Sequence, residues 1–284
     1  MKNIIAKQYS DEELKKLRCI QMELLEEVIR ICEEYQLEYV AVEGTALGAR
    51  RHQGYVPWDD DLDIAFMRED YEQFLKVAQK ELDERYFLQN YHTDPFSIGY
   101  YTKLRKNGTY FLQDCDIGIQ MNTGIFIDIF PIDRVPNKKI KAKLHRWRVY
   151  LLHQFFIAKG TAGTIGEDIS LKGRVKKMIR IILNFAMSFV SKEYLFQKLD
   201  SALQKYNGNQ NGRIAILSEY MLKGLALSYD CLFPVKKQTF EGRKISVPAD
   251  IDKYLTLVYG DYMKLPPVSK RRNHRPVELK FESE

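Results

Sequence analysis

The segment PWDDDLDIAF, residues 57–66, constrains this chain more than any other part of its sequence. Consecutive aspartates lead into an apolar run, which is the pattern of a strand that follows an acidic loop. On such a strand Asp61 and Asp63 point to one face, while the apolar residues between them pack behind it. Asp59 joins them if the strand begins early. The sequence therefore predicts two or three carboxylates within a few ångströms of one another.

Carboxylates this close repel one another, and such a cluster is tolerated chiefly where a divalent cation neutralises it. Oxygen ligands suit Mg²⁺ or Mn²⁺, which also bind substrate phosphates in phosphoryl-transfer sites. We therefore expect Asp59, Asp61 and Asp63 to bind Mg²⁺ or Mn²⁺. A solvated acidic turn is the alternative, and the apolar strand that follows argues against it. A calcium loop is excluded, because Ile64 and Asp70 stand where that loop needs Gly and Glu.

A small-residue turn precedes the acidic run. Gly44 and Thr45 follow a predicted strand over 38–43 and open a short predicted helix. Glycine lets backbone amides approach an anion, and a helix N-terminus adds partial positive charge. The turn is a candidate phosphate-binding element.

A third acid lies on a later predicted strand, GIFIDIF, where Asp128 stands between two isoleucines. A strand, a Gly-containing turn, an Asp-x-Asp strand and a later acid form the pattern of the nucleotidyltransferase superfamily. We expect Asp61, Asp63 and Asp128 to be catalytic. Asp128 is either the general base or a further metal ligand, with one metal or two in the site. A buried acid with a structural partner is the alternative for Asp128.

Basic and aromatic side chains near these acids are candidates for binding a charged substrate. Arg50, Arg51 and His52 follow the Gly turn, and Lys103 and Arg105 alternate on one face of a predicted strand. Exposed Lys and Arg often only raise solubility, so phosphate binding is one of two interpretations. The aromatic residues that could stack on a base or a quaternary amine are Trp58, Tyr100 and Tyr101.

The pattern of elements predicts an α+β fold, with a nucleotidyltransferase-like mixed sheet and helices. A capping box at Ser10 and Glu13 opens a long amphipathic helix. Asn107-Gly108 predicts a hairpin between strands over 98–105 and 109–113. Further strands are expected over 38–43, 61–66, 86–91 and 124–130, a hairpin over 240–248, and helices over 70–82 and from about 250 to 260.

The chain divides into three predicted regions, 1–135 as the catalytic core, 136–210 as a basic helical insertion and 211–284 as a C-terminal α/β segment. The net charge of +6 is mild and favours no nucleic-acid partner. The four cysteines are far apart and form no zinc motif, which suits a reduced cytoplasmic protein. The first residues lack a signal-peptide pattern, and no apolar run is long enough to span a bilayer.

The segment EGTALGARRHQGYVPWDDDLDIAFMREDYEQF resembles the signature of the LicD family. FIDIFPID and DIDKYLTLVYGDYMKLPP resemble two further blocks of that family, so the similarity spans roughly residues 20–275. Ala46 and Arg51 depart slightly from the family pattern. The residues that fall within matching blocks are Gly44, Thr45, Asp59, Asp61, Asp63 and Asp128.

The resemblance implies a metal-dependent phosphotransferase, similar to fukutin-type enzymes in its CDP-linked donor. The expected reaction moves phosphocholine, or a related phospho-alcohol, from a CDP-alcohol to a sugar hydroxyl and releases CMP. The acceptor would be a lipid-linked precursor of a cell-surface glycan, namely teichoic acid, capsule or lipopolysaccharide. The alternatives are a nucleotidyltransferase that releases pyrophosphate, a sugar-nucleotide glycosyltransferase and an inactive binding module.

The basic helical region suggests contact with a membrane. Residues 138–180 contain twelve Lys and Arg against two acids, and 174–190 has a basic start followed by an apolar run. This run is too short to cross a bilayer, but its composition is that of helices that lie at an anionic membrane surface. We expect a cytoplasmic protein with peripheral contact at the inner face of the membrane through residues 140–190. A buried core helix is the alternative.

Overall fold

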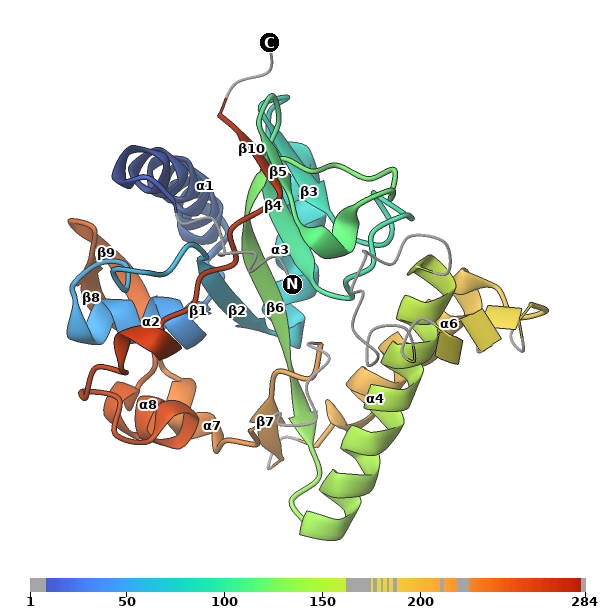
Figure 1. Ribbon diagram of the computed structural model, residues 1–284. Helices are drawn as coiled ribbons and strands as arrows, with labels where there is room; N and C mark the ends of the chain where they lie inside the picture. The colour runs from blue at the N-terminus through green and yellow to red at the C-terminus, as the bar shows by residue number, and fades with distance from the viewer. Residues whose placement is uncertain are drawn as a thin grey trace.

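A mixed sheet forms the centre of the protein in the computed structural model (Figure 1). Its strands follow the order β1-β2-β6-β4-β3, and β7 pairs with the far end of β6. β2 and β6 are parallel, and the remaining pairs of this sheet are antiparallel. The structure describes residues 9–161, 175, 178–179, 181–182, 184–185, 188–209, 212–218 and 225–281.

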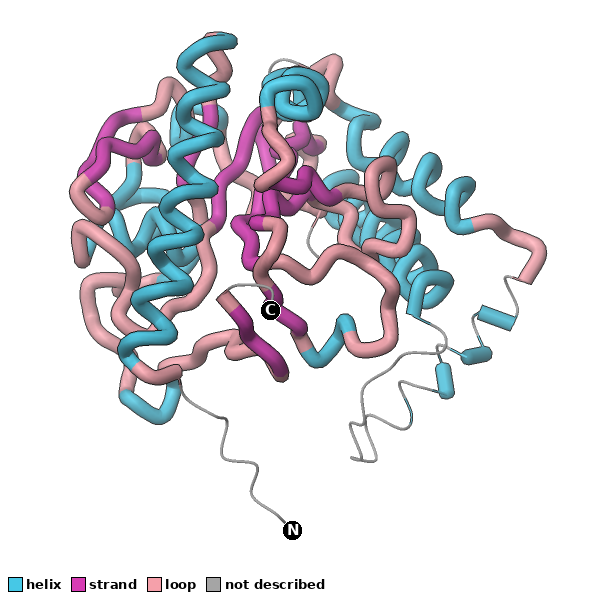
Figure 2. Tube along the Cα trace, turned by 90° about the horizontal axis from the view of Figure 1, so that it is seen from above, coloured by secondary structure: helices cyan, strands magenta, loops and turns pink. Residues whose placement is uncertain are grey.

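Two small sheets accompany the central one, formed by the pairs β8-β9 and β5-β10. Figure 2 shows the central sheet in the middle of the molecule, between helices, and the β8-β9 pair at its left edge. The strands are β1 (Tyr39–Ala41), β2 (Asp63–Met67), β3 (Tyr86–Gln89), β4 (Thr102–Lys106), β5 (Tyr110–Leu112), β6 (Ile125–Val135), β7 (Arg213–Ala215), β8 (Lys236–Phe240), β9 (Arg243–Val247) and β10 (Glu278–Lys280).

The helices in the described part of the chain lie around this sheet. The α-helices are α1 (Asp11–Tyr35), α2 (Glu43–Arg51), α3 (Arg68–Glu81), α4 (Lys139–Thr161), α6 (Lys192–Leu203), α7 (Tyr229–Leu232) and α8 (Ile251–Tyr259). The 3₁₀ turns are η1 (Asp114–Asp116), η2 (Gln204–Tyr206) and η3 (Val268–Lys270). The predicted α+β fold class is confirmed.

Helix α1 begins as the sequence predicts. The Ser10 side chain accepts from the Glu13 amide, and the Glu13 side chain accepts from the Ser10 amide. These two bonds satisfy amides at the helix start that have no partner within the helix. The buried stripe then packs on the sheet through Leu17, Gln21, Leu24, Leu25, Val28, Ile31 and Cys32.

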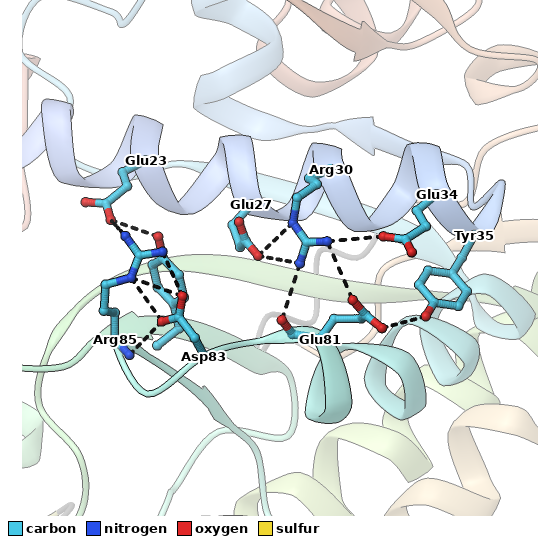
Figure 3. Close-up of polar contacts among 9 residues, drawn as sticks. Glu23, Glu27, Arg30, Glu34, Tyr35, Glu81, Asp83 and Arg85 are labelled. Atoms are coloured by element: carbon cyan, nitrogen blue, oxygen red, sulfur yellow. Dashed lines mark hydrogen bonds and ion pairs between the residues drawn. The ribbon is translucent and has the colours of Figure 1, made fainter.

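Polar contacts fasten the other side of α1 to the end of α3. Figure 3 shows Arg30 between Glu27, Glu34 and Glu81, and Tyr35 bonded to Glu81. The Arg30 guanidinium is partly exposed, so each of these pairs contributes at most about 1 kcal/mol. Their role is to set the orientation of α1 against α3.

Helices α1 and α3 cover one face of the sheet. The Phe66 ring stacks on Phe74 of α3 at a centroid distance of 5.0 Å. Because neighbouring residues on a strand point to opposite faces, Asp63, three residues before Phe66, points away from these helices. The face opposite α1 and α3 is therefore the one that carries the acids.

Strand β6 continues beyond Pro131, where the sequence analysis expected it to end. Its first half pairs with β2 on one side and with β4 on the other, but β4 reaches only as far as Ile129. The Asp128 amide donates to Leu62 on the β2 side, so by alternation Pro131 faces the β4 side. No β4 residue pairs there, and proline therefore costs no ladder hydrogen bond.

Two other sequence expectations are wrong. β4 and β5 do not form a hairpin around Asn107-Gly108, because β3 and β6 occupy both edges of β4 and β5 pairs with β10. The acidic strand begins at Asp63 and not at Asp61. The hairpin expected over 240–248 is confirmed as β8-β9, with Glu241 and Gly242 in the left-handed turn conformation.

The basic helical region packs as a second apolar cluster beside the sheet. α4 and α6 bury Val149, Phe156 and Leu199 against Tyr91 and Tyr100. The C-terminal region returns to the core through β7 on β6 and β10 on β5. Part of the apolar run predicted over 174–190 lies outside the described residues. Most of its described apolar side chains are exposed, which argues against the buried core helix that was the alternative; the exposed ones are Val175, Met178, Ile179, Ile181, Ile182, Phe185 and Phe189. None of the helices that the structure describes combines the length and the apolar character that a transmembrane span needs.

A buried ion pair joins the start of α3 to the second half of β6. Arg68 donates to both carboxylate oxygens of Asp133 at 2.8 and 2.5 Å, and Asn207 donates to the same carboxylate at 2.7 Å. Asp133 is fully buried and the Arg68 side chain is 5% exposed. Both charges are compensated, so removing one leaves the other buried without a partner.

We predict that Asp133→Asn lowers the free energy of unfolding by about 3 kcal/mol, measured by urea denaturation. Glu72→Gln is the matched control, because Glu72 also pairs with Arg68 but is 53% exposed. That control should change stability by less than about 0.5 kcal/mol. Equal effects of the two substitutions would contradict the structural role of Asp133.

Candidate active site

The centre of the candidate site is the pair Asp63 and Asp128. They are register partners in the parallel pair β2-β6, so their Cα atoms lie on adjacent strands and their side chains point to the same face. Asp63 is 8% exposed. Its amide donates to the Thr45 hydroxyl at 2.8 Å, and the Val42 amide donates to its carbonyl at 3.1 Å. Thr45 therefore positions Asp63 at the start of its strand.

Asp59 and Asp61 approach the same point from the loop before β2. This loop is held by α1, because the Arg18 guanidinium donates to the carbonyls of Val56, Pro57 and Asp59. The Gln21 amide nitrogen also donates to the carbonyl of Asp60. The loop backbone over residues 56–60 is thus bonded to α1, and bonding to β6 starts only at the Leu62 carbonyl, which accepts from the Asp128 amide. This is why β2 begins at Asp63.

The Gly44 turn packs directly against these acids. A Cβ atom at position 44 would lie 2.3 Å from Oδ2 of Asp59 and 3.7 Å from Oδ1 of Asp61. Gly44 is in the first turn of α2, where amides without intrahelical partners are available to an anion. The absence of a side chain lets Asp59 approach the start of this helix.

The electrostatics of this cluster are those of crowded carboxylates. Burial and the charge of Asp61 raise the pKa of Asp59 to about 8. Burial raises the pKa of Asp63 well above its usual range, and the charges of Asp61 and Asp128 add to this effect. Burial also raises the pKa of Asp61, while nearby His274 lowers it. Among the described residues, the acids of this cluster carry more negative charge than the nearby basic side chains, Lys103 and His274, neutralise.

The donor chemistry fits a hard divalent cation. Asp59, Asp61, Asp63 and Asp128 offer only carboxylate oxygens, which are the ligands of Mg²⁺ and Mn²⁺. Within the part of the chain that the structure describes, no three His, Cys, Asp or Glu side chains are already gathered at metal-binding geometry. Binding would therefore require rotation of carboxylates that are already neighbours. The crowding that raises their pKa values is what a cation would relieve.

Comparisons with known proteins bear on this arrangement. Residues 36–157, which contain the Gly44 turn, the acidic loop and Asp128, match the family described as LicD/FKTN/FKRP, nucleotidyltransferase domain. Over 275 residues the chain is 31% identical to the lipopolysaccharide cholinephosphotransferase LicD of Haemophilus influenzae. The matched region covers 92% of this chain and 95% of that protein. The chain belongs to the LicD family.

Two shorter matches are to uncharacterised proteins. One from Rickettsia prowazekii is 40% identical over 67 residues, 22% of this chain and 25% of that protein. One from Rickettsia typhi is 39% identical over 71 residues, 25% of this chain and 22% of that protein.

The structure separates the two basic residues of β4 in this LicD-family site. Lys103 Nζ donates to Oδ1 of Asp128 at 2.6 Å, and burial lowers the pKa of Lys103 while Asp128 opposes that shift. Arg105 is 1% exposed and donates to Gln89 and to the Gly124 carbonyl. Lys103 lies at the acids, whereas Arg105 has no surface to offer a substrate. Of the two, Lys103 is the candidate for phosphate binding.

The basic residues of α2 point toward the C-terminal region. Arg50 pairs with Asp252 of α8 at 2.8 Å, and Arg51 donates to the carbonyl of Tyr262 and to His52. Burial and the Arg51 charge lower the pKa of His52. These contacts join α2 to α8, and phosphate binding by the three side chains stays a prediction.

The aromatic candidates lie in different places. Trp58 packs on the core, and the Arg271 guanidinium lies 4.5 Å from its ring centroid. Tyr100 is buried in the α4-α6 cluster and donates to Asp200. Tyr101 contacts Phe130 at a centroid distance of 4.7 Å, on the β6 face that carries Asp128. The burial of Tyr100 argues against its stacking on a substrate. For Trp58 and Tyr101, stacking on a substrate stays a prediction.

Sequence reasoning missed the role of Asp60. Its carboxylate accepts from the Tyr9 hydroxyl at 2.7 Å and from the backbone amide of His274 at 2.9 Å. The His274 ring lies 3.5 Å from Asp60 and from Asp61, and hydrogen bonding to Asp60 raises the His274 pKa to about 9. Asp60 thus ties the C-terminal segment to the acidic loop. His274 is 214 positions away from Asp60, and no local pattern connects them.

A second omission is Glu43, which precedes the Gly44 turn. Its amide donates to the Tyr254 hydroxyl at 3.0 Å, and the Tyr259 hydroxyl donates to its Oε2 at 3.2 Å. Burial raises the Glu43 pKa, and the charge of Asp61 adds to the shift. Glu43 is the first residue of the segment that resembles the family signature, and this position could have marked it as a candidate site residue.

We predict that Gly44→Ala weakens Mn²⁺ binding by about tenfold, measured by electron paramagnetic resonance, because the new methyl group displaces Asp59. Gly208→Ala is the matched control, since a Cβ there meets no atom within 4 Å. The control should bind Mn²⁺ as the parent protein does. Unchanged Mn²⁺ affinity in Gly44→Ala would contradict the placement of Asp59 among the metal ligands.

Proposed function

We propose that this LicD-family chain transfers phosphocholine from CDP-choline to a hydroxyl group of a cell-surface glycan precursor and releases CMP. The observation that carries the proposal is the parallel register of Asp63 and Asp128 beside the Gly44 turn. This site lies in a chain that is similar over 92% of its length to a lipopolysaccharide cholinephosphotransferase. Lipopolysaccharide, capsule and teichoic acid precursors are the acceptor classes that the proposal includes.

The proposed chemistry is a displacement at phosphorus. The acceptor oxygen forms a bond to the phosphorus that carries choline, and the bond from that phosphorus to CMP breaks. The hydroxyl proton passes to a base, and negative charge collects on the departing CMP. Catalysis of this kind depends on positioning and on charge neutralisation more than on covalent chemistry.

The residues of the site have matching tasks in this proposal. Asp59, Asp61 and Asp63 would hold Mg²⁺, which supplies positive charge to the diphosphate when bound. Asp128 would take the hydroxyl proton or hold a second ion. One of its oxygens accepts from Lys103, and the other has no protein donor among the described residues. Lys103 keeps positive charge next to the reacting phosphorus.

We predict that the purified protein releases CMP from CDP-choline in the presence of Mg²⁺ and a glycan acceptor, and stops when EDTA is added. Asp61→Asn and Asp63→Asn should each reduce the rate by about 100-fold or more, measured by CMP formation. Neither should lower the metal-free stability, because each removes one charge from a repelling cluster. Asp230→Asn, an exposed acid of α7, should retain the parental rate.

The products distinguish the alternatives. Pyrophosphate released from CTP would favour a nucleotidyltransferase, and cleavage of sugar nucleotides would favour a glycosyltransferase. A full rate in EDTA, or in either active-site variant, would contradict the metal-assisted mechanism. A panel of CDP-linked choline, ethanolamine, glycerol and ribitol identifies the alcohol.

We also propose that α4 contacts an anionic membrane. Ile140, Leu144, Trp147 and Leu151 recur at helical spacing and are 77, 65, 43 and 47% exposed. By helical geometry they form one stripe along the helix. α4 packs on α6 and lies at the edge of the molecule (Figure 1).

Positive charge flanks this stripe on both sides. At 100° per residue, the exposed cations fall on either side of the apolar line and not opposite it. They are Lys139, Lys141, Lys143 and Arg148. Apolar side chains between cations are typical of helices that lie in the interface of an anionic bilayer. The charge of the stripe thus favours an acidic lipid surface, where a lipid-linked acceptor would also lie.

We predict salt-sensitive binding to vesicles that contain phosphatidylglycerol, measured by cosedimentation. Lys141→Gln should weaken binding about fivefold, because a cation near an anionic surface contributes roughly 1 kcal/mol. Leu144→Gln should weaken it by about the same factor, because this side chain would bury apolar surface in the membrane interface. Val268→Gln is the control, since Val268 is 75% exposed but outside α4. Equal binding to neutral and anionic vesicles, or no effect of either α4 variant, would contradict the docking proposal and leave the transferase proposal standing.

A further inference from the structure

Glu43 has a backbone conformation that ordinary residues rarely adopt. Its φ angle is +44°, in the left-handed region that favours glycine. Such a conformation costs on the order of 1 kcal/mol and persists only where surrounding contacts hold it. Here Tyr254 accepts from the Glu43 amide and Tyr259 donates to its carboxylate. The strained backbone directs this side chain to one place.

That place is a cavity of about 440 Å³ on the face of the sheet opposite α1 and α3. Its walls are largely aliphatic and come from β6, from the segment around β7 and from α7 and α8. Glu43 is the one acidic residue among those that line it, and the rings of Tyr254 and Tyr259 complete the wall. Tyr259 is 43% exposed, so the cavity is open to solvent beside it. The aliphatic residues include Ile132, Ile214, Leu232, Leu257 and Val258.

The Glu43 carboxylate has no positive partner among the described residues. Its side-chain bond is with Tyr259, and no Lys, Arg or His of the described chain pairs with it. An acid in an apolar cavity is costly unless its charge is compensated. Tyrosine hydroxyls donate hydrogen bonds but carry no charge. The cavity therefore offers one negative charge, two aromatic rings and apolar walls to a positively charged group.

The cavity adjoins the proposed reaction centre. The Val42 amide, next to Glu43, donates to the Asp63 carbonyl at 3.1 Å. Ile132 lies on the same strand as Asp128 and an even number of residues along it, so both side chains point to one face of the sheet. A group attached to the phosphorus near Asp63 and Asp128 can therefore extend along this face into the cavity.

We infer that this cavity binds the trimethylammonium group of the phosphocholine donor, with Glu43 as its counter-charge and Tyr254 and Tyr259 as its aromatic walls. Quaternary ammonium groups donate no hydrogen bonds and are bound by ring faces, apolar contacts and a nearby negative charge. A primary ammonium needs several acceptors, and aliphatic walls do not supply them. This inference rests on the proposed function and names the part of the chain that selects choline.

The test compares binding and turnover for choline and ethanolamine compounds. Isothermal titration with phosphocholine and with phosphoethanolamine, in the presence of Mg²⁺, measures the preference without any transfer. Glu43→Gln and Tyr259→Leu should each weaken phosphocholine binding by about tenfold. They should change phosphoethanolamine binding much less. Tyr259→Phe keeps the ring and should retain most of the affinity.

Controls separate the cavity from general effects. Glu278→Gln on β10 and Tyr194→Leu on α6 change the same residue types at exposed positions and should bind phosphocholine normally. With CDP-choline as donor, the Glu43 and Tyr259 variants should raise KM more than they lower kcat.

Two results would overturn the inference. One is an unchanged preference for phosphocholine in both variants. The other is a Glu43→Gln variant that loses Mg²⁺ affinity and turns over CDP-choline and CDP-ethanolamine equally poorly, which would make Glu43 a metal ligand. Phosphocholine binding that depends on Glu43, without CMP release, would keep the cavity and reject the transferase. CMP release with a donor preference that does not depend on Glu43 would keep the transferase proposal and reject the cavity as the choline site.

Discussion

The parallel pairing of β2 with β6 is the interaction on which the site depends. It makes Asp63 and Asp128 register partners, and antiparallel β4 then places Lys103 opposite Asp128. A shift of one residue in this register would turn one acid toward the α1-α3 core. The apolar residues that alternate with the acids prevent that shift, because they fill the core on the other face. The positions of the acids are therefore fixed by hydrophobic packing.

Two sets of acids in this protein differ in how their charge is compensated. Asp133 is paired with Arg68, and Asp60 accepts bonds from Tyr9 and from the His274 amide, so each has partners that hold it in one place. The acids at the proposed reaction centre instead crowd one another, and burial with mutual repulsion raises the pKa values of Asp59, Asp61 and Asp63. Uncompensated charge, and not burial alone, distinguishes the acids available to a metal and a substrate.

Several parts of the site come from the end of the chain. His274 lies against the acidic loop, α8 supplies the tyrosines that hold Glu43, and β10 pairs with β5 beyond them. The C-terminal segment therefore completes the site that the first 135 residues begin. α4 adds a separate element, because its apolar stripe is exposed while its opposite side packs on α6. The proposed membrane contact therefore uses residues of α4 that are not part of the proposed active site.

The sequence by itself determined the α+β class, the capped helix α1, the β8-β9 hairpin and the acids that gather at the site. Each of these is encoded locally, in capping residues, in turn residues or in alternation along a strand. The sequence misplaced three features that depend on distant segments. β5 pairs with β10, because β3 and β6 occupy both edges of β4, and β6 continues past Pro131 where β4 has ended. β2 starts late, because α1 binds the backbone of the acidic loop before it. Arg105 and Lys103 look equivalent in the sequence, yet only Lys103 lies at the acids. Glu43 and its tyrosines are about 210 residues apart, and only the tertiary structure brings such distant side chains around one cavity.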